Sequence, residues 1–304
     1  MTKPDGLNPF ATRLPELAVR ALPLMQAVGS VTKTAHQLGV SQSAVSQSIA
    51  ELEKRLGVKV LRRGSQPVQL TDEGKLIAQY ALSVQAAEEN ALASINDLRQ
   101  NKGGRVRIGS SGPSASTQLL PNVMTRFSRH YPGIALELRE AQDQEIIAAL
   151  RRGEVDVAVV PGLDGNEEFE SLPIACDRLV AITADDMDLP QHMSAEAFQQ
   201  QPFIMTKGGS EPLVRKWFGR SDIEPRVDHS IQQITSILAV VRSGLACSII
   251  AELALPEDLD GVKVLPLDPP APRSLFLTRL PKTPSNSAVT RFWEFAEQEI
   301  YREE

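Results

Sequence analysis

The feature that most constrains the fold is a pair of short amphipathic segments within residues 31–56, separated by a glycine. Apolar residues recur along each segment at the spacing of one helix face, as Val45 and Ile49 do in the second. Gly39 can end the first helix because glycine enters the left-handed conformation with little strain. Ser41 can cap the second helix through its hydroxyl. The spacing therefore predicts a helix-turn-helix whose second helix, from about Ser41 to residue 56, is the recognition helix.

Polar side chains cover the face of this recognition helix that the core does not use. Gln42, at its N-terminal end, has the geometry for a bidentate hydrogen bond to adenine. Ser43 and Ser46 can bond base edges or phosphates. Ordinary solvation of an exposed helix face is the alternative explanation. The candidate DNA-binding residues are Lys33, Ser41, Gln42, Ser43, Ser46, Gln47, Arg62 and Arg63.

The charge of the chain is unevenly distributed. Residues 1–70 contain nine Lys and Arg against four Asp and Glu, a net charge of +5, whereas the whole chain carries −6. The rest of the chain therefore carries −11. A basic module on an acidic body is typical of a protein that binds nucleic acid locally, because only the basic part meets phosphates.

The segments around the helix-turn-helix complete the first domain, predicted over residues 14–72. Residues 57–64 and 67–70 predict two short strands around a turn, a wing that offers Arg62 and Arg63 to phosphates or a minor groove. One of these two arginines could instead pair with Glu51 or Glu53. Residues 14–28 predict a helix in which Pro23 either forms a kink or begins a shorter helix. Residues 1–13 predict a flexible tail.

A long helix follows, predicted over residues 73–100 and capped by Thr71. Ile77, Val84, Ala91 and Leu98 recur every seven residues, with Tyr80, Ala87 and Ser94 three positions further on. A helix of about 27 residues is about 40 Å long, and one narrow apolar seam on it favours a partner helix. Packing of a single helix on its own domain is the alternative. The predicted dimerisation residues are Ile77, Tyr80, Val84, Ala87, Ala91 and Leu98.

Residues 101–105, with Gly103 and Gly104, predict a hinge before an α/β domain over residues 106–304. The alternation of apolar runs with helical segments indicates βαβ units, which repeat in a second lobe. Lobe 1 is predicted over about 106–177 and 263–304, and lobe 2 over about 178–262. Strands are expected at 106–109, 134–139, 155–160, 179–182, 203–205, 223–227, 247–250, 262–265 and 274–278, and helices at 118–130, 142–152, 212–218, 231–242 and near the C-terminal end.

Three loops fall at the ends of these strands, where open α/β sheets bind ligands. They are residues 109–114, 206–210 and 230–233, rich in hydroxyls and main-chain amides that suit a carboxylate or another oxyanion. Ordinary loop and cap residues are the alternative explanation. The predicted effector-binding residues are Ser110, Ser111, Gln142, Thr206, Lys207, Ser210 and Gln233.

Other classes of protein receive little support. The first residues lack the apolar core of a signal peptide and no apolar run approaches the ~20 residues of a membrane span, so we expect a soluble cytoplasmic protein with no membrane partner. Cys176 and Cys247 are predicted to be buried thiols rather than a redox pair. No HExxH or Walker loop is present and Gly109–Gly112 misses the nucleophile-elbow spacing, so we expect neither an enzyme nor a cofactor nor a metal. A two-lobed solute-binding protein would explain the body but not the helix-turn-helix.

These motifs together resemble the LysR-type transcriptional regulators over nearly the whole chain. The most specific block runs from Gly29 through residues 41–46 to Gly57, Arg62-Arg63 and Gly74. Moderately specific blocks follow in residues 104–109, Leu119-Leu120-Pro121, Tyr131-Pro132-Gly133, residues 153–158 and residues 241–246.

The resemblance implies an α/β fold with an N-terminal winged helix-turn-helix, a linker helix and a two-lobed effector-binding domain like a periplasmic binding protein. It implies a homodimer or homotetramer that binds an interrupted palindrome near a promoter, contacts RNA polymerase and responds to a small anionic metabolite. It places effector contacts in the first two loops.

The sequence departs from the family pattern at several positions. Pro23 follows the place, Leu22, where the family usually has Phe, and Thr34 replaces an alanine. Gln47 stands where an arginine is common, which removes one expected phosphate contact. Ala246 replaces a glycine and Ala251 a frequent proline, and the segment between Ile108 and Pro121 is one residue longer.

Overall fold

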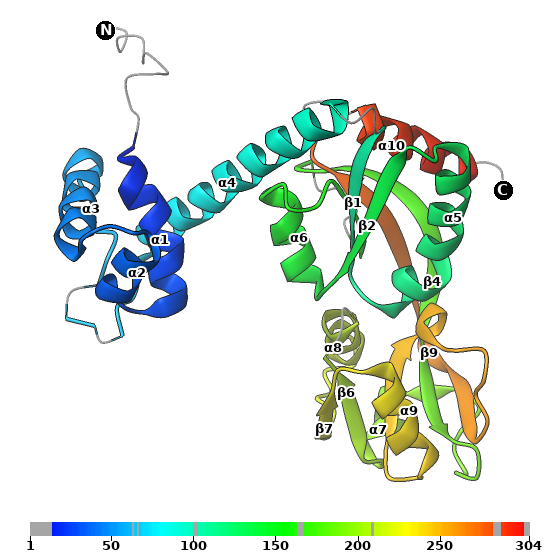
Figure 1. Cartoon of the computed structure of the whole chain (residues 1–304). Helices are drawn as coiled ribbons and strands as arrows, with labels where there is room; N and C mark the ends of the chain where they lie inside the picture. The colour runs from blue at the N-terminus through cyan, green and yellow to red at the C-terminus, as the bar shows by residue number, and fades with distance from the viewer. Residues whose placement is uncertain are drawn as a thin grey trace, which may run out of the picture. The chain divides into compact units, whose positions relative to one another are not determined.

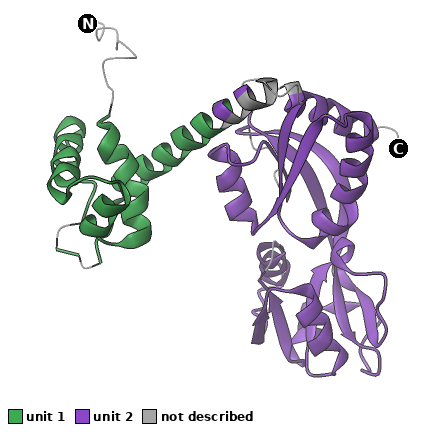
Figure 2. Ribbon diagram, in the orientation of Figure 1, with its two compact units in different colours: residues 1–91 green, residues 92–304 purple. Residues whose placement is uncertain are grey.

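The computed structural model describes residues 14–62, 64–65, 67–99, 103–162, 167–207, 210–281 and 287–300. The chain forms two compact units, Met1–Ala91 and Leu92–Glu304 (Figure 2). The boundary between them lies within helix α4 (Asp72–Arg99), inside the predicted linker helix. The predicted tail lies outside the described residues. In the part of the chain that the structure describes, no helix is long and apolar enough to cross a bilayer.

The first unit contains the predicted helix-turn-helix. Its helices are α1 (Glu16–Val28), α2 (Val31–Gln37) and α3 (Gln42–Leu56), followed by the start of α4. The Ser41 hydroxyl accepts a hydrogen bond from the Ala44 amide at 3.1 Å, which confirms the predicted cap of α3. Gly39 has a φ of 68° directly after α2, so the turn depends on the conformation that glycine adopts cheaply.

One apolar core joins these helices. Val45, Ile49 and Leu52 of α3 are buried against Leu22 and Met25 of α1. Helix α1 continues through Pro23, so the alternative of a shorter helix that begins there is wrong. Proline removes one main-chain hydrogen bond, at a cost of about 3 kcal/mol. Full burial of Leu22 and Met25 contributes about 1.5–3 kcal/mol for each side chain, which offsets that cost.

The predicted wing is shorter than expected. The two strands predicted over 57–64 and 67–70 are reduced to one antiparallel bridge between Leu61 and Leu70. The Ser65 hydroxyl accepts a hydrogen bond from the Gln69 amide at 3.0 Å and donates one to the Arg62 carbonyl at 3.1 Å. These local side-chain bonds close the turn and compete with a longer strand ladder.

Helix α4 begins where the sequence predicts. The Thr71 hydroxyl accepts a hydrogen bond from the Gly74 amide at 3.0 Å and donates one to the Lys59 carbonyl at 2.7 Å. Ala78, in the second turn, is buried in the helix-turn-helix core. The cap and this contact tie the start of α4 to the first unit.

Within its described residues, the second unit is built on one sheet of nine strands. The strands lie in the order β2-β1-β3-β9-β4-β8-β6-β7, and β5 pairs with β9. The strands are β1 (Gly104–Ser110), β2 (Ile134–Glu140), β3 (Val157–Pro161), β4 (Glu170–Ala184), β5 (Met193–Ser194), β6 (Phe203–Thr206), β7 (Val227–Ile231), β8 (Cys247–Ala251) and β9 (Val262–Arg279). The helices are η1 (Ser114–Leu119), α5 (Leu120–His130), α6 (Asp143–Arg151), α7 (Ala195–Gln199), α8 (Glu211–Gly219), α9 (Ile234–Arg242), η2 (Glu252–Ala254) and α10 (Ser287–Ile300).

Two long antiparallel strands, β4 and β9, pass through both lobes. The sequence predicted β4 only over 179–182 and divided β9 into two separate strands. Beyond these limits the two strands stabilise each other by pairing, and polar and proline residues interrupt their apolar patterns. The first half of β9 packs in lobe 2, where Leu265, Leu267 and Ala271 join its core. The predicted lobe boundary at residue 263 is therefore about ten residues too early.

Helices cover both faces of the sheet in each lobe. In lobe 1, α5 and α10 contribute Phe127 and Phe292 to the core on one face, and α6 contributes Ile146 and Leu150 to the other (Figure 1). In lobe 2, the core on one face gathers Phe198, Phe203, Trp217 and Phe218, and α9 covers the other face.

Several predicted element limits need correction. The strand predicted at 223–227 is β7, which begins at Val227, because a turn closed by the Ile223 amide on the Phe218 carbonyl precedes it. The helix predicted to open at residue 231 begins at Ile234, because β7 continues through Ile231. The predicted helix at 118–130 is preceded by the π-helix η1.

The predicted hinge also needs correction. The Gly103 amide donates a hydrogen bond to the Gly133 carbonyl at 2.8 Å, and Gly104 and Arg105 pair with β2. These residues therefore belong to the sheet of lobe 1. Residues 101–102 lie outside the described residues.

Candidate functional site

The polar face of α3 is exposed, as a surface that binds a partner must be. Gln42, Ser43, Ser46 and Gln47 are all exposed, and so is Lys33 on α2. The Gln42 side-chain carbonyl accepts a hydrogen bond from the Thr32 hydroxyl at 3.0 Å. The Ser41 and Ser43 hydroxyls lie 2.9 Å apart. Residues of α2 and α3 therefore orient one another at the N-terminal end of the recognition helix.

Acidic residues neutralise part of the basic cluster that follows α3. Glu51 forms an ion pair with Arg55, and Glu53 forms one with Lys59. Burial alone would raise the pKa of Glu53, but the hydrogen bonds from Lys59 and Val60 lower it below its usual value. Glu51 and Glu53 therefore pair with Arg55 and Lys59, and neither pairs with Arg62 as the alternative supposed. Arg62 is exposed, and Arg63 lies outside the described residues.

A small cavity of about 50 Å³ lies between the two lobes of the second unit. Three of the predicted residues line it: Ser111 after β1, Thr206 at the end of β6 and Ser210 before α8. The structure therefore brings the first two predicted loops together across the lobes. From the third loop, Gln232 lines the cavity instead of the predicted Gln233, and it follows β7 directly.

The other predicted effector residues do not line this cavity. Ser110 is fully buried, and its hydroxyl lies 2.8 Å from that of Ser116. Lys207 forms an ion pair with Glu211 at 3.0 Å. Gln142 and Gln233 are exposed residues that precede α6 and α9 without side-chain caps. Ser110 and Lys207 therefore have structural partners, whereas Gln142 and Gln233 are exposed at the starts of their helices.

Arg273 of β9 is the functional candidate that sequence reasoning missed. Its guanidinium lines the cavity and donates two hydrogen bonds to the Asp177 carboxylate, both at 2.7 Å. It also donates one to the Ser114 hydroxyl at 2.8 Å. The only sign of Arg273 in the sequence was a single cation between two apolar runs. The strand predicted at 274–278 began one residue after it.

Asp143, in the first turn of α6, adds a second carboxyl group near the cavity. Its Oδ1 atom is buried and has no hydrogen-bond partner among the described residues. Burial raises the pKa of Asp143, and the neighbouring Ser111 hydroxyl and the positive charge of Arg273 partly offset this rise. The cavity therefore combines hydroxyls, one guanidinium and nearby carboxyl groups.

An exposed apolar stripe runs along α4. Tyr80 and Val84 of the predicted dimerisation set are 51% and 44% exposed, and Ala87 and Ala91 are exposed as well. Ile77 is half-buried against the helix-turn-helix core, and the side chain of Leu98 lies outside the described residues. Prediction from heptad spacing missed three more exposed apolar residues of this helix: Leu76, Leu92 and Ile95.

The two cysteines differ in their exposure to solvent. Cys247 is buried as predicted, and burial raises the pKa of its thiol to about 12. Cys176 is exposed, so its predicted burial is wrong; it lies on β4 at the junction of the two lobes. The described residues contain no cluster of His, Cys, Asp or Glu that could hold a metal ion.

A helix-turn-helix unit followed by a two-lobed α/β unit with a cavity between its lobes defines a class, the DNA-binding regulators that carry a ligand-binding domain. Residues 19–75 match the family described as "Bacterial regulatory helix-turn-helix protein, lysR family". Residues 99–300 match the family "LysR substrate binding domain". The chain belongs to the LysR family of transcriptional regulators.

Relatives agree with this assignment. The "Probable HTH-type transcriptional regulator LrrA" of Synechococcus elongatus is 31% identical over 228 residues, which cover 74% of this chain and 77% of LrrA. CbnR, solved in a complex with its target DNA, has a TM-score of 0.64 at 17% identity, covering 94% of this chain and 99% of CbnR. The effector-binding domain of QuiR, solved with shikimate, has a TM-score of 0.59 at 20% identity, covering 66% of this chain and 98% of that domain.

Proposed function

We propose that this regulator binds an interrupted palindrome near a promoter through α3, as a homodimer or homotetramer. The observation that carries the proposal is the exposed polar face of α3, which Thr32 and Ser41 orient. The net positive charge of residues 1–70 supports attraction to phosphates. CbnR provides a precedent for DNA binding by this fold. A palindrome follows from two-fold symmetry, because each protomer would present its own copy of α3.

We expect Gln42→Ala to weaken binding to the specific site by about 1–3 kcal/mol while sparing non-specific binding. The amide of Gln42 would lose a bidentate contact with a base, whereas phosphate contacts would remain. Titration of the protein's own promoter region and of random duplex, each at several salt concentrations, measures both affinities. Thr32→Val should give a smaller loss of the same kind, because it removes only the hydrogen bond that orients Gln42.

Gln79→Ala, at an exposed position of α4, is the matched control for Gln42→Ala and should leave both affinities unchanged. An equal loss on specific and random DNA would mean that Gln42 only positions the backbone. If the wild-type protein shows no salt-sensitive preference for its promoter region, the proposal itself fails.

We further propose that a small anionic metabolite binds between the two lobes and switches the regulator. Ser111, Thr206 and Ser210 offer hydroxyls there, and Arg273 offers a positive charge. The cavity of about 50 Å³ is smaller than most metabolite sites, which occupy about 300–1,000 Å³. The lobes must therefore separate to admit a metabolite, so binding would select a different angle between them. QuiR with shikimate is a precedent for a ligand in this fold.

A thermal-shift screen of small carboxylates and oxyanions tests this proposal, because a ligand that binds only the folded state raises the melting temperature. We expect Ser111→Ala and Thr206→Val to reduce the shift given by a hit. The exposed Ser243→Ala should preserve it. A hit whose shift is the same in all variants would bind elsewhere, and a preference for cations would exclude an anionic effector.

The remaining parts of the proposal concern the regulator as a whole. We propose that it dimerises through the apolar stripe of α4, contacts RNA polymerase, acts in the cytoplasm and catalyses no reaction. The exposed Tyr80 and Val84 support dimerisation. The names of its relatives support regulation rather than catalysis. Turnover of a substrate that Ser111→Ala abolishes would contradict the last point.

A further inference from the structure

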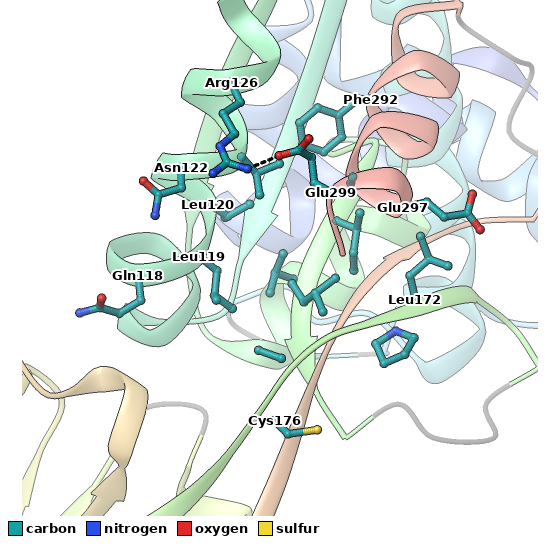
Figure 3. Close-up of a pocket in the computed structure, with 17 residues that line it drawn as sticks. Gln118, Leu119, Leu120, Asn122, Arg126, Leu172, Cys176, Phe292, Glu297 and Glu299 are labelled. Atoms are coloured by element: carbon teal, nitrogen blue, oxygen red, sulfur yellow. Dashed lines mark hydrogen bonds and ion pairs between the residues drawn. The ribbon is translucent and has the colours of Figure 1, made fainter. Parts of the chain in front are cut away.

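A buried ion pair lies on the two strands that connect the lobes of the second unit. Asp177 of β4 and Arg273 of β9 are direct partners in the register of these strands, and both side chains are almost fully buried. Figure 3 shows the two strands side by side at Cys176, the residue before Asp177. Leu172 of β4 packs in lobe 1 and Leu179 in lobe 2, so the ion pair lies where β4 passes between the lobes.

Each member of this ion pair also bonds to a group outside the two strands, and these two groups lie in different lobes. The Arg273 guanidinium donates a hydrogen bond at 2.8 Å to the hydroxyl of Ser114, the first residue of η1. The Asp177 carboxylate accepts a hydrogen bond at 3.1 Å from the amide of Leu253 in η2. We call these four linked groups the lobe clasp.

The two helices at the ends of the lobe clasp are each anchored in their own lobe. Ala115, next to Ser114, is buried in the core of lobe 1, and Ala254, next to Leu253, packs against the core of lobe 2. Ser114, Ala254 and Arg273 also line the cavity between the lobes. The lobe clasp therefore forms part of the wall of the candidate effector cavity and links its two sides.

The lobe clasp opposes any movement that separates the lobes. Ser114 would move with lobe 1 and Leu253 with lobe 2, so one of the hydrogen bonds to the ion pair would have to break. Both bonds involve an ionised group in buried surroundings, and such bonds are stronger than those between neutral groups. Water can reach these groups only after the lobes have separated.

We propose that the lobe clasp sets how much binding free energy an effector must contribute to open the cavity between the lobes. The observation that carries the proposal is a buried ion pair whose two members bond to different lobes. The inference rests on the proposed function, in which the lobes separate to admit a metabolite. The apparent affinity for an effector falls in proportion to the fraction of molecules that are open, so the lobe clasp would set the effector concentration that switches the regulator.

Distances between spin labels on the two lobes test the lobe clasp without any effector. Gln144→Cys on α6 and Ser236→Cys on α9 place the labels at exposed positions of lobe 1 and lobe 2. Cys176→Ser removes the exposed thiol, whereas Cys247 is buried and stays unlabelled. The labelled full-length protein is diluted into an excess of unlabelled protein, so that pairs of labels within one chain dominate. Double electron–electron resonance then measures the ratio of open to closed molecules.

Ser114→Ala in this labelled protein should raise the ratio of open to closed molecules at least about tenfold, the effect of losing a hydrogen bond to a charged group. The guanidinium would lack this partner in the closed arrangement, whereas water would supply one in the open arrangement. Ser116→Ala is the matched control on the same helix, because the Ser116 hydroxyl bonds to Ser110 and Gly112 within lobe 1. It should leave the ratio unchanged.

Arg273→Lys is the second variant, because an ammonium keeps a positive charge beside Asp177 but lacks the fork that holds both carboxylate oxygens and Ser114. It should also raise the ratio at least about tenfold. Circular dichroism selects the variants that fold. An unchanged ratio in either folded variant, or an equal rise in Ser116→Ala, would overturn the lobe clasp. The absence of any hit among carboxylates and oxyanions would instead contradict the proposed effector, and the distances would be unaffected.

Discussion

Arg273→Ala lowers the free energy of unfolding of the second unit by about 3–5 kcal/mol, the range expected when one partner of a buried ion pair is removed. The Arg273 and Asp177 side chains are only 6% and 3% exposed. Without the guanidinium, the Asp177 carboxylate keeps a hydrogen bond from the Leu253 amide but loses its counter-charge. Denaturant titration followed by tryptophan fluorescence measures the change, since Trp217 lies in the core of lobe 2 and Trp293 in that of lobe 1.

A double variant separates loss of the pair from loss of packing. Arg273→Met combined with Asp177→Leu should come within about 1–2 kcal/mol of the wild type, because it leaves no uncompensated charge. The control is the Arg178–Glu252 pair, whose side chains are 56% and 41% exposed. Arg178→Ala should cost less than about 1 kcal/mol. If Arg273→Ala costs no more than Arg178→Ala, the buried pair contributes little to the stability of this unit.

Val84→Asp should prevent dimerisation and weaken binding to the palindrome about a hundredfold. In the proposed dimer, each protomer would bury an unpaired carboxylate in the α4 stripe, which apolar contacts cannot offset. Loss of the dimer removes the second half-site, and this second contact multiplies affinity by about 10²–10⁴. Sedimentation velocity measures the assembly, and DNA titration measures the affinity.

The control for Val84→Asp is Gln79→Asp, which adds the same charge to an exposed polar position of α4. It should leave the dimer intact and change DNA affinity only slightly. A fully dimeric Val84→Asp protein would exclude this stripe as the interface. A monomer that binds the palindrome as tightly as the wild type would instead exclude dimerisation as a requirement for affinity.

Local chemistry made the first unit predictable. Caps by Ser41 and Thr71 and the turn at Gly39 depend on groups a few residues apart, and the structure contains each of them. The wing was less predictable, because bonds within the turn, such as those of Ser65, competed with pairing of the strands. Helix periodicity is sufficient to predict that the candidate DNA-binding residues of α2 and α3 lie on faces away from the core.

The candidate effector site was predictable only in part. The strand-end rule identified loops that contribute Ser111, Thr206 and Ser210 to one cavity. It also selected Ser110 and Lys207, whose side chains are held by Ser116 and Glu211. Spacing along a chain does not show which side chain of a loop faces the cavity, because residues of both lobes form its walls.

The sequence by itself determined the helix-turn-helix, the cap of α4 and the alternation of strands and helices, because these depend on contacts within a few turns or on periodic burial. Only the tertiary structure decided how β4 and β9 join the lobes, since pairs such as Cys176 and Ser274 are about a hundred residues apart. The same long-range pairing brings Arg273 to Asp177. Such contacts depend on the whole sheet, and no local pattern specifies them.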